Sequence, residues 1–149
     1  MAIFIVRGPE TCDVQAPGCR PLPGPLMTAL VQRALEAGIS VAQRSCPSEQ
    51  ALLDTLCAAD HSPDDILLLA PAACVHSPRL QRLLPHLHNA YVEVHEDDPH
   101  APQARLPANL GHRLGIAQGY CMQSYALALE LALEHLCRTD AGERVHVGT

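Results

Sequence analysis

The sequence contains no lysine and no tryptophan, and its aromatic residues are one phenylalanine and three tyrosines. All ten basic residues are arginines, so a mechanism that forms a Schiff base on a lysine amine is excluded. With so few aromatic rings, the core has to be built from leucine, isoleucine, valine and alanine. The chain of 149 residues is long enough to bury one such core.

The formal net charge of −6 leaves no excess of positive charge that could bind a phosphate backbone. A nucleic-acid partner is therefore not expected. The sequence also has no apolar run near the ~20 residues that a membrane span needs. No cationic stretch precedes its first apolar run, MAIFIV. We expect a cytoplasmic protein without a membrane partner.

Seven cysteines are scattered along the chain, and no two of them form a CxxC pair. Neither a zinc ribbon nor a thioredoxin-like redox site is indicated by such spacing. In a reducing compartment these thiols are expected to behave as small, mostly buried apolar groups. The residues are Cys12, Cys19, Cys46, Cys57, Cys74, Cys121 and Cys137.

Short apolar runs alternate with segments of helical periodicity. The run ILLLAPAA from Ile66 is continuous, as in a central parallel strand, whereas Leu26, Leu30 and Leu35 recur at helical spacing. This alternation predicts the α/β class, with a five-stranded, doubly wound parallel sheet and helices on both faces. Strands are expected over residues 2–6, 39–43, 90–94 and 113–117, and one more begins at residue 66. A first helix is expected from residue 25, and a second begins after a serine cap at 45 or 48. Two further helices are expected over 78–84 and 125–136.

One domain is expected over residues 1–138, followed by a polar tail over 139–149. In a doubly wound sheet, ligands bind beyond the carboxyl ends of the strands. The segment EVHEDDPH follows the fourth predicted strand and holds two histidines and four carboxylates within eight residues. This density makes the carboxyl edge of the sheet the expected place for a site.

The order of motifs resembles the type II 3-dehydroquinate dehydratases over nearly the whole chain. The family pattern runs NGPN, a lid loop, N-[AP]-G-x-x-[TS]-H-[TS], EVH-[ILS]-SN and G-[VI]-I-x-G-x-G-x-x-GY-x-x-AL. The matching pieces are 7–10 (RGPE), 70–77 (APAACVHS), 93–95 (EVH) and 115–119 (GIAQG) running on to 123–127 (QSYAL). The resemblance implies a flavodoxin-like sheet and assembly as a homo-oligomer, a trimer or a dodecamer of four trimers.

The resemblance also implies a reaction, the dehydration of 3-dehydroquinate to 3-dehydroshikimate through an enolate. In the family, a lid-loop tyrosine next to an arginine takes the proton, and the histidine of EVH protonates the leaving hydroxyl. Here His95 matches that acid and Glu93 its orienting partner. His76 matches a histidine that binds substrate hydroxyls, with Ser77 beside it. This is general acid–base catalysis by two groups whose pKa values are shifted by their surroundings.

Several family residues are missing, most of all the tyrosine base. Without a gap from Glu10, its position in the lid-equivalent loop 10–24 falls on Leu22, and the lid arginine falls on Pro17, with Arg20 nearby. The substrate arginine after EVH falls on Leu106, next to Arg105. Two site asparagines and the aspartate of the family's LRD motif are also replaced. Their positions hold Glu10, Ala70 and Leu83.

The segment after EVH is acidic, Glu96-Asp97-Asp98, where the family presents amides and a serine to the substrate carboxylate. Two like charges about 4 Å apart repel by roughly 1 kcal/mol in water, and by more in a desolvated pocket. Either these side chains point away from the site, or the ligand that Asp97 helps to bind is not an anion.

Three functional hypotheses remain open. The first is a diverged homologue that has lost the standard dehydration and binds another small metabolite in the strand-end pocket. The second is an active dehydratase with a replacement base: Glu10, raised in pKa by burial, or less plausibly a thiolate of Cys12 or Cys19. The third is a cation site, although no known ligand spacing supports it. Its ligands would be His76, His95, His100, Glu93, Asp97 and Cys74.

No cofactor and no resident metal are expected on balance. The turn Gly8-Pro9 follows the first strand, but neither a glycine-rich run nor a P-loop lysine accompanies it, so it does not indicate a nucleotide site.

Overall fold

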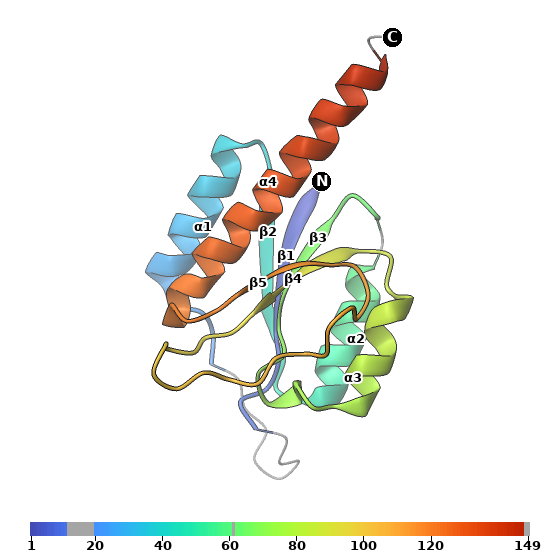
Figure 1. Ribbon diagram of the computed structural model, residues 1–149. Helices are drawn as coiled ribbons and strands as arrows, with labels where there is room; N and C mark the ends of the chain where they lie inside the picture. Colours follow the sequence, from blue (N-terminus) through green and yellow to red (C-terminus); the bar gives the residue numbers. More distant parts are fainter. Residues whose placement is uncertain (12–19, 61, 148–149) are drawn as a thin grey trace.

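The computed structural model describes residues 1–11, 20–60 and 62–147, with side chains up to residue 138 (Figure 1). Much of the predicted loop 10–24 and two of its cysteines lie outside the described residues. Five strands form one sheet in the order β2-β1-β3-β4-β5, and all four pairings are parallel. This is the flavodoxin-like order, so the predicted fold class is confirmed. The strands are β1 (Ala2–Arg7), β2 (Ser40–Ser45), β3 (Ile66–Ala70), β4 (Ala90–Val94) and β5 (Arg113–Ala117).

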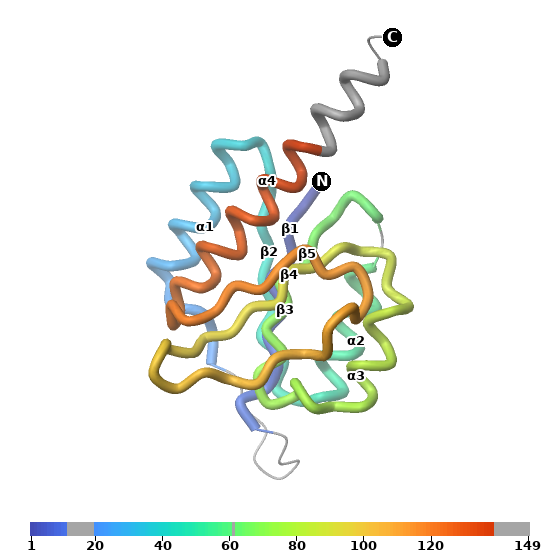
Figure 2. The backbone as a smooth tube through the Cα atoms, viewed as in Figure 1, coloured from blue at the N-terminus to red at the C-terminus, as the bar shows by residue number. Residues whose placement is uncertain are grey.

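The helices cover both faces of the sheet (Figures 1 and 2). Helices α1 and α4 pack on one face, and α2 and α3 pack on the other, each over its own cluster of buried aliphatic side chains. The four helices are α1 (Gly24–Glu36), α2 (Glu49–Ala59), α3 (Pro78–Leu83) and α4 (Ser124–Val147), with short 3-10 turns η1 (Ala72–Cys74), η2 (Leu84–His86) and η3 (Cys121–Gln123).

Local sequence signals explain where these elements begin. All five residues of β3 are buried, as expected for a central strand covered on both faces. Of the two candidate caps for α2, Ser48 is the one used: its hydroxyl accepts a hydrogen bond from the amide of Ala51, 3.1 Å away. Ser45, the other candidate, is the last residue of β2.

The last helix extends beyond its predicted end. Helix α4 does not end at Leu136 but continues to Val147, so the expected polar tail over 139–149 is helical as far as residue 147. Extending a helix adds one backbone hydrogen bond for each residue fixed, and this segment contains alanine, glutamate and arginine, which are good helix formers. Within the described residues, no helix has the length and apolar character needed to cross a membrane.

Close backbone approaches hold the carboxyl edge of the sheet together. Gly8 donates its amide to the carbonyl of Ala70, 2.7 Å away, and a Cβ at Gly8 would lie 2.4 Å from the carbonyl oxygen of Pro71. Only glycine fits there. Ala72 follows with a φ of 50°, and Cys121 at the start of η3 has a φ of 51°. Both are left-handed conformations that favour glycine, the residue that the family pattern places at both positions.

Candidate functional site

A buried ion pair stands at the end of β4. Glu93 is 0 % and His95 is 1 % exposed. The Nε2 atom of His95 makes a short hydrogen bond to Oε2 of Glu93, and its Nδ1 atom lies 3.3 Å from Oε1 of Gln103. The predicted contact between the acid and its orienting partner is therefore present. Both ring nitrogens of the histidine are occupied by the protein itself.

Glu93 has two further partners. Its Oε2 accepts the amide of Leu106 at 2.9 Å, and its Oε1 accepts NH1 of Arg113, on β5, at 2.8 Å. Burial alone would raise the pKa of Glu93, but the contacts with His95, Leu106 and Arg113 outweigh it and hold the pKa below its ordinary value. Burial likewise opposes charge on His95, yet Glu93 raises the pKa of the imidazole overall. Both shifts favour the charged forms, a carboxylate on Glu93 and an imidazolium on His95.

A second charge pair, buried on its arginine side only, joins the end of β1 to the loop after β4. The Nε atom of Arg7 donates to Oε1 of Glu96 at 2.8 Å, and NH2 donates to Oε2 at 3.1 Å. The hydroxyl of Tyr125, from α4, makes a short hydrogen bond to the same carboxylate and accepts Nε of Arg7 at 3.1 Å. Burial and the charge of Glu96 raise the pKa of Tyr125, so this hydroxyl remains protonated.

Asp97, predicted from the sequence to bind substrate, anchors the backbone in this structure. Its Oδ1 accepts the amide of Gly119 and its Oδ2 accepts that of Gln103, each at 2.8 Å. Although burial opposes the charge, these amides lower the pKa of Asp97. The neighbouring Asp98 caps a turn by accepting the amides of His100 and Ala101.

The acidic segment after EVH is therefore satisfied internally. Glu96 is paired with Arg7, and Asp97 and Asp98 accept backbone amides. The sequence left two alternatives open: these side chains point away from the site, or the ligand is not an anion. The contacts favour the first, because the carboxylates are directed toward donors of the chain itself. Their charge is partly balanced before any ligand arrives.

The candidate substrate residues after β3 lie in different settings. His76 is exposed in the turn that follows η1. Ser77 is buried and caps α3: its hydroxyl accepts the amide of Leu80 at 3.2 Å and makes a short hydrogen bond to Glu49. The contact with the Leu80 amide explains why α3 begins here, because the first amides of a helix lack backbone acceptors and a side-chain oxygen can accept one of them.

Glu10 and Arg105 are both exposed. The Oε1 atom of Glu10 lies 3.6 Å from Nε of Arg20 and 3.4 Å from the amide of that residue. The burial that the replacement-base hypothesis required of Glu10 is not found. Leu22, on which the position of the family's tyrosine falls when counted without a gap, is only 5 % exposed and belongs to the core cluster that includes Leu26 and Leu30 of α1.

The cation-site hypothesis gains no support from the described part of the chain. Within it, no group of three histidine, cysteine, aspartate or glutamate side chains is arranged to hold a metal ion. Three of the proposed ligands already have other partners. Cys74 packs in the core, and both ring nitrogens of His95 contact Glu93 and Gln103. The carboxylate of Asp97 accepts backbone amides.

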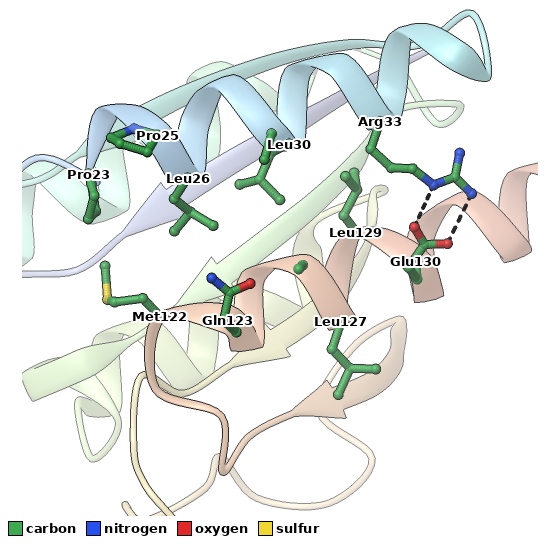
Figure 3. A pocket seen from close by; sticks show the side chains of 12 residues that line it. Pro23, Pro25, Leu26, Leu30, Arg33, Met122, Gln123, Leu127, Leu129 and Glu130 are labelled. Carbon is green, nitrogen blue, oxygen red and sulfur yellow. Dashed lines mark hydrogen bonds and ion pairs between the residues drawn. The ribbon is translucent and has the colours of Figure 1, made fainter.

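An apolar groove of about 650 Å³ lies between α1 and α4 (Figure 3). Leu26 and Leu30 line it from α1, and Leu127 from α4. The two-point ion pair between Arg33 and Glu130 crosses its rim, with Nε 2.6 Å from Oε1. The lining includes none of the predicted site residues, so this groove is separate from the carboxyl edge of the sheet.

Sequence reasoning missed the partners that organise the site. Arg113 and Gln103 hold Glu93 and His95, while Arg7 and Tyr125 hold Glu96. One signal was available for Arg7, because it ends the first strand at the edge where sites form. The rest required the packing of β5 and α4 against β4.

Comparison with known proteins agrees with this fold. The chain is similar to a 3-dehydroquinate dehydratase from Ralstonia pickettii (strain 12J), with 31% identity over 110 residues, which cover 72% of this chain and 71% of the relative. No protein-family model matches the chain.

Two solved structures share the fold. A type II dehydroquinase from Propionibacterium acnes superimposes with a TM-score of 0.67 at 22% identity, over 89% of this chain and 98% of its own. One from Butyrivibrio crossotus DSM 2876 gives a TM-score of 0.68 at 18% identity, over 89% and 97%. Together with the identity to the curated relative, the retained Glu93–His95 contact and the strand order lead to one conclusion: the chain belongs to the type II 3-dehydroquinate dehydratase family.

Proposed function

We propose that this chain is a family member that has lost the standard dehydration of 3-dehydroquinate to 3-dehydroshikimate. The observation that carries the proposal is the burial of Leu22. The position of the family's base holds an aliphatic side chain that is 5 % exposed and is part of the core. An aliphatic group cannot accept a proton, so a side chain of this kind cannot act as the base.

Two of the three tyrosines, Tyr91 and Tyr125, are poorly suited to replace the base. Tyr91 and Tyr125 are buried, and burial raises the pKa of Tyr91 to about 12. Tyr120 is 64 % exposed, at the N-terminal side of η3. A general base works best when its pKa lies near the operating pH, which a buried, protonated phenol does not meet.

The acid of the pair is also restrained. To protonate a leaving hydroxyl, His95 has to break a hydrogen bond with Glu93 or Gln103 and reach solvent from a site that is 1 % exposed. This supports the reading that the Glu93–His95 pair now stabilises the fold.

An active dehydratase with a replacement base remains the second candidate, because the Glu93–His95 contact is retained. Glu10 is its base in that case, and it would have to leave Arg20 to act. A small metabolite other than 3-dehydroquinate is the ligand that the first proposal implies.

The test is to add 3-dehydroquinate to the purified chain and follow the ultraviolet absorbance of the enone product. We expect no rate above background at high protein concentration, beside an active family member as the positive control. A rate that disappears in His95→Ala would overturn the proposal. Glu10→Gln, with the exposed Glu36→Gln as its matched control, would then test the replacement base.

We further propose a cytoplasmic homo-oligomer, a trimer or a dodecamer, by analogy with the family. The exposed thiols of Cys57, Cys121 and Cys137 suit a reducing compartment. Sedimentation of the purified chain separates a trimer from a dodecamer by mass, and a monomer would contradict the assembly.

A further inference from the structure

Arg7 is held by groups from several parts of the fold. Besides Glu96 and the hydroxyl of Tyr125, its NH1 donates to Oγ of Ser45 on β2, 3.3 Å away, and to the carbonyl of Arg20 by a short hydrogen bond. A guanidinium presents donors in a rigid fork that matches the two oxygens of a carboxylate. The geometry at Glu96 is this two-point match.

The two halves of the ion pair differ in their exposure. The side chain of Arg7 is 7 % exposed and that of Glu96 is 27 %. The cation is fixed on a strand and surrounded by protein. The carboxylate comes from the loop after β4 and forms the outer half of the pair. A carboxylate approaching from solvent would meet Glu96 before it met Arg7.

We propose that Arg7, Tyr125 and Ser45 form a carboxylate-binding site at the carboxyl edge of the sheet, and that Glu96 is its built-in occupant. The chain thereby supplies from its own sequence the anion that the buried guanidinium requires. The site takes a small carboxylate from solution once Glu96 is removed, and in the native chain it is closed to acidic ligands.

Tethering explains why Glu96 keeps the site. A ligand on the same chain competes at an effective concentration in the millimolar range or above, with no cost of association from solution. A free carboxylate of equal intrinsic affinity is therefore excluded at ordinary concentrations. This carboxylate site rests on the proposed function in one respect: we expect the acid 3-dehydroquinate not to bind the native chain. The carboxylate site itself is tested by binding, without turnover.

The probe is sodium acetate, compared with sodium chloride at equal ionic strength, and the readout is the thermal midpoint of unfolding. We expect Glu96→Ala to unfold at a lower temperature in chloride, because Arg7 loses its counterion. Acetate should restore the midpoint saturably and bind this variant at least tenfold more tightly than the native chain. Acetamide, which has the same shape without the charge, should have no effect.

The matched control removes both charges, as the double variant Arg7→Met, Glu96→Leu. It should show no difference between acetate and chloride. The proposal is overturned if Glu96→Ala shows no acetate-specific shift, or if the double variant shows the same shift. If Glu96→Ala does not fold in either salt, the same titration on Glu96→Ser, whose short side chain also leaves the site open, decides with the same two outcomes. A native chain that dehydrates 3-dehydroquinate would refute the proposed function and leave the acetate result standing.

Discussion

The guanidinium of Arg113 lies 2.8 Å from the carboxylate of Glu93, and this contact joins β5 to β4 beneath the candidate site. The glutamate is 0 % exposed and the arginine side chain 16 %. The same NH1 group also lies 3.4 Å from the carbonyls of Leu106 and Pro107. Arg113 therefore positions both the buried acid pair and the loop that closes over it.

Removing the guanidinium of Arg113 should destabilise the fold, because the buried carboxylate of Glu93 then loses a charged partner. We expect Arg113→Met to lower the free energy of unfolding by about 2 kcal/mol, because Glu93 loses one charged hydrogen-bond partner and keeps His95. Arg113→Lys keeps a charge near Glu93 and should lose less. Urea unfolding at pH 7 measures both, and equal losses in the two variants would show that packing, not charge, dominates.

The Glu93–His95 pair predicts a pH dependence of stability. The pKa of His95 is raised on folding, so its contribution is fully present below the unfolded value of about 6.5 and is lost as the pH rises through the higher folded pKa. The pKa of Glu93 is lowered, so its contribution is present above the unfolded value of about 4.3 and is lost as the pH falls through the folded pKa.

The free energy of unfolding should consequently decline as the pH rises above about 6.5. Urea midpoints from pH 5 to 9 measure this decline. In His95→Gln the decline should be smaller, whereas His100→Gln, at an exposed imidazole, is the control. An unchanged slope in His95→Gln would assign the pH dependence to other groups.

Ala72 offers a stabilising substitution. Its φ of 50° costs an L-residue about 1 kcal/mol or more, which glycine avoids. After the loss of backbone entropy that glycine brings, Ala72→Gly should raise the free energy of unfolding by about 0.5–1 kcal/mol. The neighbouring Ala73→Gly has no such strain to relieve and should be destabilising. Thermal unfolding of both variants decides, and destabilisation by both would contradict the conformation at residue 72.

Gly8 should tolerate no side chain. A Cβ there would lie 2.4 Å from the carbonyl oxygen of Pro71, which is backbone and cannot swing aside. We expect Gly8→Ala to destabilise the fold by about 3 kcal/mol, as overpacking against a fixed group does. At Gly24 a Cβ meets no described atom within 4 Å, so Gly24→Ala is the control. Similar unfolding midpoints for the two variants would refute the close approach of β1 and the β3 loop.

Asp97 should matter for stability more than its half-buried neighbour Asp98. An asparagine at 97 can offer one oxygen to the amides of Gly119 and Gln103, so one of them loses its acceptor. We expect Asp97→Asn to cost about 2 kcal/mol at pH 7, and Asp98→Asn, on an exposed turn, to cost less. Urea unfolding tests the order of the two losses. The reverse order would contradict the anchoring role of Asp97.

The sequence by itself determined the fold class. Periodicity placed β4 and β5 at their observed bounds, and the continuous run at Ile66 identified the central strand. These are local signals, because burial on one or both faces imposes its period on the residues of one element. The end of α4 was missed, since a helix that extends beyond the core needs no apolar stripe.

At the candidate site, the sequence predicted the contact of Glu93 with His95: Glu93 is on β4 and His95 follows the end of that strand two residues later, so the two side chains share a face. It could not assign Asp97, Ser77 or Glu10, because the partner of a carboxylate or hydroxyl is decided by whatever packs against it. Only the tertiary structure brought Arg7 from β1 against Glu96, far along the chain. A guanidinium removed from water requires an anion, and which anion it finds depends on contacts that no local pattern encodes.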